Sequence, residues 1–286
     1  MEQLIAHINR SGKSVQSSIC HDDAPRLLQL KQDEIHLWCC DDTQVKDAAL
    51  LQHYRTWLDE VELGRLRRFH FARHRHQFLV TRALVRYALS SYLPSTGPAA
   101  WRFGTNDYGR PMLAHPGMVA SGLEFNLSHT HCLAVLAICH SGELGVDVEY
   151  HRRPCDATLL SDRFFSPLEA RQLKALPESQ QRQRFFDHWT LKEAYIKARG
   201  MGLAIPLSSF SFDLSAPGAI GFGVEPEAGD RGEGWRFWQL RPNATHKIAV
   251  AHRAGESAVM TKLRCLQVVP NVSIKPVDYT VFNSTR

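Results

Sequence analysis

The sequence predicts an α+β fold made of two similar halves that follow one another along the 286-residue chain. Strand-like apolar segments alternate with segments whose apolar residues recur at helical spacing. The two halves also echo each other. Residues 68–69 precede a helical segment at 79–86, and residues 163–165 precede another at 189–195. A duplicated α+β unit with pseudo-two-fold symmetry, joined near Gly142, would produce this pattern.

The composition is that of an ordinary soluble globular protein, with 44% apolar and 22% charged residues. The net charge of +5 and the pI near 8.9 suit an anionic ligand or an acidic protein partner. The positive charge is too weak and too dispersed to indicate nucleic-acid binding, and no nucleic-acid motif accompanies it.

No apolar run approaches the roughly 20 residues of a membrane span, and residues 1–12 lack the apolar core of a signal peptide. The seven cysteines are odd in number and include no C-x-x-C spacing, which favours thiols in a reducing compartment. We therefore expect a cytoplasmic protein with no membrane attachment.

The first half begins with an irregular lead-in over residues 1–33, followed by a strand at 35–38. Residues 43–92 have a helical pattern with an apolar stripe between Phe78 and Tyr87, and a Pro-rich turn follows. The next elements are predicted as a short strand at 101–103, a turn at 106–111, an extended segment ending at 125–129, and a hairpin of strands at 132–139 and 144–149.

In the second half, Ser166 and Pro167 predict a helix N-terminus, and a long helix is expected from about Gln180 to Ala198, ending at Gly200. Strands are predicted at 206–214 and 235–250, and a polar, poorly packed tail after about 255. The predicted division is a lead-in (1–33), an N-terminal subdomain (34–142), a C-terminal subdomain (143–255) and a tail (256–286).

Two acidic residues share one face of the second hairpin strand. Side chains alternate along a strand, so Asp147 and Glu149 lie on the same face as Gly145, opposite the apolar residues between them. Paired carboxylates of this kind suit Mg²⁺, Mn²⁺ or Ca²⁺. A strand with one solvated acidic face is the alternative.

On the long helix, Trp189, Glu193 and Lys197 are four residues apart and lie along one face. By itself this spacing is more typical of a surface Glu–Lys pair, which stabilises a helix by only a few tenths of a kcal/mol.

Three further polar groups are candidates for phosphate contacts. Ser128 and His129 end an extended segment, where their side chains point apart, and no nucleophile elbow is present, which excludes a serine hydrolase. The basic residues at 65–68 and 73–76 could bind a phosphomonoester, or could simply form a solvated helix face. Arg110 lies on a tight turn, where a lone arginine is more often simply exposed to solvent.

Taken together and in this order, these motifs resemble the Sfp-type 4′-phosphopantetheinyl transferases. That family has a G-[IV]-D-[IV]-E strand and, roughly 40 residues later, a W-x-x-K-E-[AS]-[YF]-x-K helix, which match residues 145–149 and 189–197. Residues 108–111 resemble its Y-G-[KR]-P turn, residues 125–129 its F-N-[LI]-S-H segment, and residues 68–69 with the following helix its N-terminal signature. The resemblance covers residues 35–252.

The resemblance implies a pseudo-two-fold α+β fold that binds coenzyme A in the cleft between its halves. It implies transfer of 4′-phosphopantetheine to a serine of an apo acyl or peptidyl carrier protein, with release of 3′,5′-ADP. Asp147, Glu149 and Glu193 would hold Mg²⁺, with Mn²⁺ as an alternative. Glu193 would also help deprotonate the serine, directly or through a water, and Lys197 would stabilise or protonate the leaving phosphate.

The same resemblance assigns the other contacts with coenzyme A. Ser128 and His129 would contact its phosphates, Arg110 and Pro111 its nucleotide, and Lys192 would add positive charge nearby. Arg65 or Arg68 would bind the 3′-phosphate, although Glu62 stands where the family often has lysine. Because one chain supplies both halves, a monomer is expected.

Two alternatives stay open. The chain could be a binding module that kept this fold and lost the chemistry, although the acidic trio and Lys197 are present. It could also be another Mg²⁺-dependent phosphotransferase, but a P-loop is absent from the sequence. Fatty acid, polyketide and nonribosomal peptide carriers are equally compatible with the motifs.

Overall fold

The computed structural model describes residues 27–114, 116–254 and 261–285, and it has the predicted α+β character. The helices are α1 (Ala48–Trp57), α2 (Glu60–Arg68), α3 (Ala72–Ser90), α4 (Pro116–Val119), α5 (Ala157–Phe164), α6 (Pro167–Lys174) and α7 (Glu178–Arg199). Short 3-10 helices are η1 (Asp42–Gln44), η2 (Pro98–Ala100), η3 (Gly202–Ala204), η4 (Leu207–Ser209) and η5 (Pro226–Ala228).

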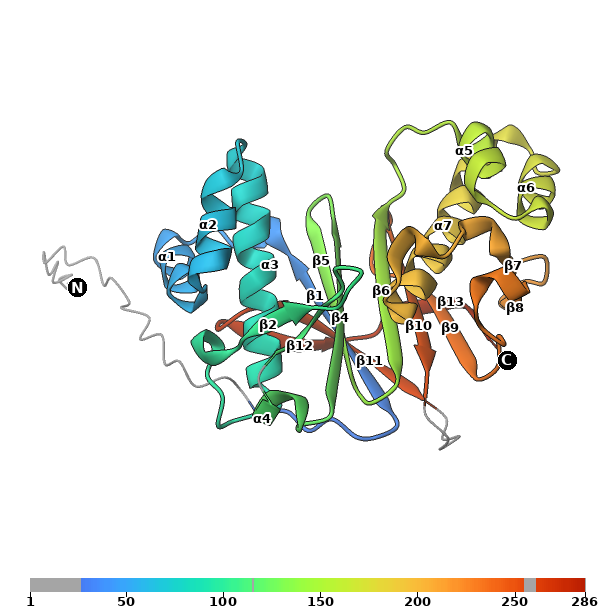
Figure 1. Cartoon of the computed structure of the whole chain (residues 1–286). Coiled ribbons are helices and arrows are strands. Elements are labelled where there is room, and N and C mark those ends of the chain that lie inside the picture. The colour runs from blue at the N-terminus through green and yellow to red at the C-terminus, as the bar shows by residue number, and fades with distance from the viewer. Residues whose placement is uncertain (1–26, 115, 255–260, 286) are drawn as a thin grey trace, which may run out of the picture.

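Two larger sheets form the centre of the molecule (Figure 1). The first has the order β12 (Ser273–Val277), β11 (Lys262–Val269), β1 (Glu34–Asp41), β5 (Leu133–His140) and β4 (Leu123–Thr130). The second has the order β13 (Thr280–Ser284), β9 (Trp235–Arg241), β10 (His246–Arg253) and β6 (Glu143–Tyr150). Two small hairpins complete the strands: β2 (Phe103–Thr105) with β3 (Pro111–Leu113), and β7 (Phe210–Asp213) with β8 (Gly221–Val224).

The sheets pack against each other through one face and carry helices on the other. Alternate residues of β1, such as Leu37, join Val146 of β6 and Val250 of β10 in a core between the sheets. The opposite side chain, Trp38, joins a core with α1 and α3, while α7 packs on β6 and β10. Helices therefore cover both outer faces, as Figure 1 shows.

The two sheets meet where their edge strands β4 and β6 lie side by side. Side chains of β4, and not its backbone, accept hydrogen bonds from the backbone amides of β6 there. Asn126 Oδ1 accepts a hydrogen bond from the Val146 amide at 3.0 Å, and Ser128 Oγ accepts one from the Val148 amide at 3.3 Å. Both donors would otherwise be unsatisfied and buried. The segment at 125–129 is thus the seam between the halves.

Local sequence signals explain where several helices begin and end. Ser166 and Glu169 form a reciprocal capping box at the start of α6, with Pro167 in its first turn, as predicted. The long helix α7 ends at Gly200, which adopts a left-handed conformation (φ 66°). Asp59 and Glu62 form a second capping box on α2.

The expectation of a poorly packed tail after residue 255 is wrong for the described residues 261–285. β11 pairs in parallel with β1 and antiparallel with β12, and β13 pairs with β9 in the other sheet. Leu266 and Val268 are buried in the core with α1 and α3. The end of the chain therefore supplies strands to both sheets, and the predicted division into subdomains stays a prediction.

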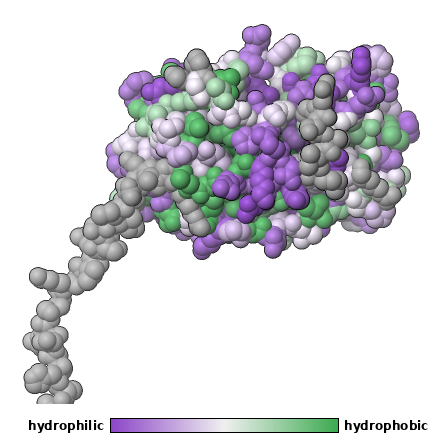
Figure 2. All heavy atoms as spheres, turned by 90° about the horizontal axis from the view of Figure 1, so that it is seen from below, coloured by the Kyte–Doolittle hydropathy of each residue, from purple (hydrophilic) through white to green (hydrophobic). Residues whose placement is uncertain are grey.

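The surface is mixed in polarity. The face seen from below has hydrophobic residues beside strongly hydrophilic ones (Figure 2), as is usual for a folded protein. Among the residues that the structure describes, no helix has the length and apolar character needed to cross a bilayer. The six described cysteines are free thiols, and burial raises the pKa of Cys40 to about 12. Cys20 and most of the predicted lead-in lie outside the described residues.

Candidate functional site

The predicted alternation of β6 is confirmed. Leu144, Val146 and Val148 lie in the core between the sheets, while Gly145 faces α7. Asp147 shares the face of Gly145 and is only 4% exposed. The acidic face of this strand is therefore covered by the long helix rather than open to solvent.

Gly145 allows α7 to lie directly on β6. A Cβ atom at this position would be 2.0 Å from the carbonyl oxygen of Ala194 and 2.5 Å from the amide nitrogen of Ala198. Only a glycine permits such an approach. The close contact places Glu193 and Lys197, which flank Ala194 and Ala198 on the helix, beside the acidic strand.

Asp147, Lys197 and Ser128 form a tight polar cluster that joins β6, α7 and β4. Lys197 Nζ donates to Asp147 Oδ1 at 2.6 Å and to Ser128 Oγ at 2.9 Å, and Ser128 Oγ donates to the same Asp147 oxygen at 2.9 Å. The other oxygen, Oδ2, is buried and has no hydrogen-bond partner. Such a buried, unsatisfied carboxylate oxygen is costly unless a ligand binds it.

Glu149 and Glu193, the other two predicted metal ligands, lie close enough to Asp147 for its negative charge to raise their pKa values. Burial, and then the charge of Asp147, raises the pKa of Glu149 to about 7. The same two causes raise the pKa of Glu193. Glu149 has a partial counter-charge in Arg153 at 3.1 Å. Mutual repulsion of this kind is relieved by a cation.

Within residues 27–114, 116–254 and 261–285, no group of three or more histidine, cysteine or acidic side chains is already arranged around a metal position. The donor set nevertheless fits a hard cation, because the unpaired oxygen of Asp147 and the raised pKa values of Glu149 and Glu193 both call for positive charge. Lys197 forms its ion pair with Asp147, and its charge only partly offsets the rise in the pKa values of Glu149 and Glu193.

A cavity of about 310 Å³ adjoins this cluster and lies between the halves. It is lined by residues from the turn after β2, from β4, from the end of α7 and from the loop that follows: Tyr108, Gly109, Arg110, Pro111, Phe125, Asn126, Leu127, His129, Ile196, Lys197, Gly200 and Gly202. Four of the predicted site residues, Arg110, Pro111, His129 and Lys197, therefore line one cavity.

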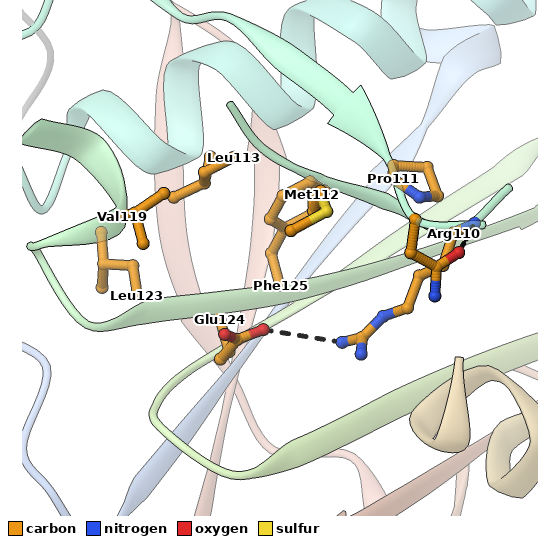
Figure 3. Close-up of a pocket in the computed structure, with 9 residues that line it drawn as sticks. Arg110, Pro111, Met112, Leu113, Val119, Leu123, Glu124 and Phe125 are labelled. Atoms are coloured by element: carbon orange, nitrogen blue, oxygen red, sulfur yellow. Dashed lines mark hydrogen bonds and ion pairs between the residues drawn. The ribbon is translucent and has the colours of Figure 1, made fainter. Parts of the chain in front are cut away.

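Arg110 holds the turn against the second half. Its guanidinium donates to the carbonyl oxygens of Leu144 at 3.3 Å and Ala198 at 3.4 Å. It also pairs with Glu124 at 3.6 Å, at the edge of a second cavity of about 210 Å³ (Figure 3). Arg110 therefore connects the halves as well as lining the larger cavity.

His129 is exposed at the end of β4. Partial desolvation, the charge of Lys197 and the charge of Arg65 lower its pKa. Arg65 on α2 is thus near enough to act on the site, and its guanidinium lies 5.3 Å from the Phe78 ring centre. Arg68 is exposed on the same helix and does not line the cavity.

The prediction that Lys192 adds charge to the ligand site is wrong. Lys192 is fully buried on the opposite side of α7, where its ammonium group donates to the carbonyl oxygens of Leu207 and Phe210 at 2.7 Å each. It also pairs with Glu169 at 2.8 Å. Successive helix residues are about 100° apart, so Lys192 and Glu193 point to different surroundings.

Glu62 also has a structural role. It is 8% exposed and forms ion pairs with Arg82 and, at 2.6 Å, with Arg86. Its carboxylate therefore neutralises two arginines of α3 and does not stand free at the ligand site.

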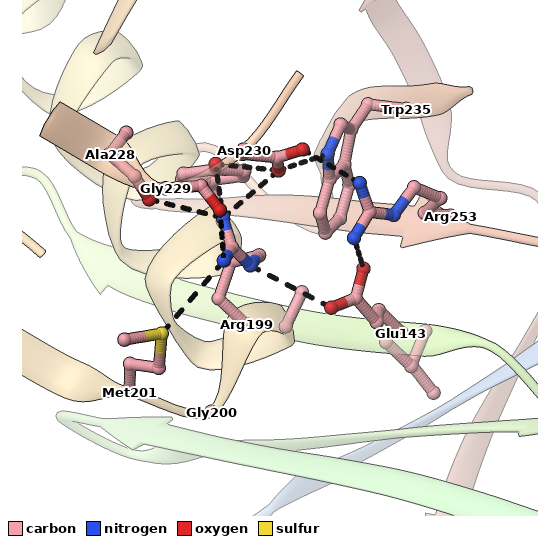
Figure 4. A network of polar contacts seen from close by, with 12 residues as sticks. Glu143, Arg199, Gly200, Met201, Ala228, Gly229, Asp230, Trp235 and Arg253 are labelled. Carbon is pink, nitrogen blue, oxygen red and sulfur yellow. Dashed lines mark hydrogen bonds and ion pairs between the residues drawn. The ribbon is translucent and has the colours of Figure 1, made fainter. Parts of the chain in front are cut away.

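One polar network was not predicted from the sequence (Figure 4). Asp230, whose side chain is 2% exposed, accepts hydrogen bonds from Tyr195 at 2.9 Å and Trp235 at 2.8 Å, and pairs with Arg199 at 3.0 Å. Against the effect of burial, the bonds from Trp235 and Tyr195 lower the pKa of Asp230 to about 2. The network ties the end of α7 to neighbouring strands, because Arg253 links Asp230 to Glu143 at the start of β6.

Comparison with known proteins gives one consistent family. Residues 143–251 match the model of the 4′-phosphopantetheinyl transferase superfamily, and residues 47–141 match the model of a 4′-phosphopantetheinyl transferase N-terminal domain.

Individual relatives agree with these models. The chain is 36% identical to the 4′-phosphopantetheinyl transferase HetI of Nostoc sp. over 227 residues, which covers 79% of this chain and 91% of the relative. It is 30% identical to the Sfp transferase of Bacillus subtilis, over 59% of this chain and 72% of the relative. A phosphopantetheinyl transferase from Thraustochytrium sp. is also 30% identical, over 70% and 72% of the two chains.

Proposed function

The chain belongs to the 4′-phosphopantetheinyl transferase superfamily, and from this premise we propose that it transfers 4′-phosphopantetheine from coenzyme A to a serine of an apo acyl or peptidyl carrier protein. The observation that carries the proposal is the cluster of Asp147, Lys197 and Ser128 at the edge of the cavity between the halves. It combines a buried carboxylate, a cation and a hydroxyl where a pyrophosphate can bind.

In this mechanism Glu193 accepts the proton of the carrier serine as the serine oxygen attacks the phosphorus that bears the pantetheine arm. The bond from that phosphorus to the adjoining phosphate breaks, and 3′,5′-ADP leaves. The half-buried carboxylate of Glu193 lies beside Asp147 and Lys197, where it can accept this proton. Lys197 stabilises the negative charge of the departing phosphate.

Asp147, Glu149 and Glu193 are the residues that would hold Mg²⁺, or Mn²⁺ in its place. When bound, the metal would neutralise charge on the pyrophosphate. Arg110, Pro111 and His129 line the cavity that would receive the nucleotide. Arg65, whose charge acts on His129, is the preferred candidate for the 3′-phosphate, with Arg68 as the other. Ser128, the predicted contact to the coenzyme A phosphates, would also hold Asp147 and Lys197 in place through its hydroxyl group.

We also propose that the protein acts as a monomer, because one chain supplies the β2–β3 turn, β4 and α7, which line the cavity. We propose a cytoplasmic location because the six described cysteines are free thiols, as in a reducing compartment.

The direct test is to incubate the protein with coenzyme A, Mg²⁺ and a set of apo acyl and peptidyl carrier proteins, and to weigh each carrier by mass spectrometry. We expect the mass of at least one carrier to increase by one phosphopantetheine group, and a chelator to prevent the increase. If no carrier in a broad set gains mass, the proposed activity is wrong.

Stabilisation by Mg²⁺ is expected to depend on pH. Glu149 has a pKa of about 7 in the folded protein, against 4.5 for the unperturbed group. Folding therefore disfavours its ionised form, so the free energy of unfolding of the metal-free protein should fall as the pH rises from about 4.5 to about 7. Mg²⁺ favours the ionised form and should raise the Tm more at about pH 8 than at about pH 6.

Scanning calorimetry with Mg²⁺ or with a chelator measures this difference without requiring activity. Glu149→Gln is the control, because it should reduce both the fall in stability and the Mg²⁺ effect. Equal Tm shifts at the two pH values in the unmodified protein would contradict the assignment of Glu149 as a metal ligand.

A further inference from the structure

A strongly basic corner lies where α2 meets α3. The sequence has no acidic residue between Glu62 and Asp107. Six side chains around the turn, which we call the basic corner, are all exposed: Arg67, Arg68, His70, Arg73, His74 and Arg75. In the part of the chain that the structure describes, none of these arginines forms an ion pair with a carboxylate. The corner therefore presents positive charge that the fold itself does not neutralise.

The start of α3 breaks the local rules for a stable helix. Its N-cap residue is Phe71, which makes no side-chain capping bond and is 55% exposed, and its first turn contains no acidic residue. Arg73 and His74 occupy that turn instead, although the N-terminus of a helix favours negative charge. By contrast, aspartate or serine side chains cap α1, α2, α5 and α6.

Cations at an uncapped helix N-terminus lower stability, so local stability does not explain these residues. Arg75 is the exception within the corner, because its guanidinium donates to the carbonyl oxygens of Phe69 at 2.7 Å and His70 at 3.1 Å and braces the turn. Arg67 and Arg73 make no comparable contact with the backbone in the described residues.

The basic corner flanks the candidate site. In Figure 1, the corner is at the upper end of the N-terminal half, and β6 leads into α5 at the same end of the other half. Arg65, one turn before the corner, is close enough to His129 to lower its pKa. A protein that presents a serine to Glu193 from this end would therefore lie against the corner.

We propose that the basic corner docks an acidic surface of the carrier protein and orients its serine toward the site; this rests on the proposed function. Charges at the rim of an interface steer association and fix orientation, and their effect decreases with salt. Phe71 adds an exposed aromatic contact at the centre of the charges. Nucleic acid is a less suitable partner, because the net charge of the chain is only +5.

Arg73→Glu distinguishes a role in docking from a role in folding, because it should weaken binding of the carrier protein without lowering the Tm. A carboxylate in the first turn of α3 suits the helix dipole, so the Tm should stay the same or rise. We expect the KM for the carrier protein to rise by about tenfold at low ionic strength, with kcat and the KM for coenzyme A unchanged. Added salt should raise the KM of the unmodified protein and narrow the difference between the two proteins.

The matched control is Lys275→Glu, an equal change of charge at an exposed position on β12, the sheet edge farthest from β4. Its KM for the carrier should stay within about twofold of the unmodified protein. The proposal is overturned if Arg73→Glu leaves the KM for the carrier unchanged, or if it mainly weakens binding of coenzyme A. It is also overturned if the corner binds a short DNA duplex through Arg73 without affecting the carrier.

The unmodified protein is assayed first, so that failure of the proposed function can be distinguished from failure of the docking proposal. If it modifies no carrier, the proposed function fails and the docking proposal fails with it. If it modifies a carrier and Arg73→Glu behaves like Lys275→Glu, only the docking proposal is wrong.

Discussion

Replacing Glu193 with glutamine is expected to lower the rate of phosphopantetheine transfer by about 10²–10⁴-fold, the usual contribution of a general base. Glutamine keeps the size of the side chain but cannot accept the serine proton. Glu193 is half-buried on α7 beside Asp147 and Lys197, so we attribute the loss of transfer rate to the missing carboxylate and not to a change in packing. Binding of coenzyme A should be largely retained, because Lys197, Arg110 and His129 still line the cavity.

Single-turnover transfer followed by mass spectrometry gives the rate, and calorimetric titration gives the affinity for coenzyme A. Glu233→Gln, at an exposed loop position before β9, is the matched control and should transfer normally. A Glu193→Gln protein that remains fully active would exclude the role as a base. Loss of coenzyme A binding with an unchanged rate at saturation would instead make Glu193 a binding residue.

Gly145→Ala is expected to lower the free energy of unfolding by about 3 kcal/mol, at the upper end for overpacking, and to abolish most of the transfer activity. The added methyl group would lie 2.0 Å from the carbonyl oxygen of Ala194, so α7 must move away from β6. That movement would also separate Lys197 from Asp147, which are 2.6 Å apart in the native arrangement.

Gly64→Ala provides a control with the opposite sign. Gly64 lies within α2 and a Cβ there meets no atom within 4 Å, so alanine should raise the free energy of unfolding by about 0.5–1 kcal/mol. Urea denaturation of both variants measures the two effects. If Gly145→Ala were as stable as the unmodified protein, the close contact between β6 and α7 would not be a real constraint.

Local periodicity predicted the parts of the fold that depend on near neighbours in the sequence. The period of two in residues 144–149 predicted which side chains of β6 enter the core. The long helix, its end at Gly200 and the cap at Ser166 are all local signals and are confirmed. The family resemblance and the α+β class are confirmed as well.

The errors came from contacts between residues that are far apart in the sequence. Lys192 belongs to the core because its partner Glu169 lies on another helix, which no helical spacing could reveal. The packing of the tail was missed because β11 pairs in parallel with β1, which lies more than 200 residues earlier in the chain. No local pattern in the tail indicates that partner. The roles assigned to the acidic trio and to the cavity residues remain predictions, which the variants above test.

The strands of the tail have a consequence for how the chain folds during synthesis. β1 is synthesised more than 200 residues before β11, its partner on one side. Until residues 261–285 have been synthesised, β1 and β9 each present an open edge that can pair with other chains. Such late, distant pairing favours slow folding. The two halves are therefore poor candidates for separate expression, and a premature stop before residue 261 would leave both sheets incomplete.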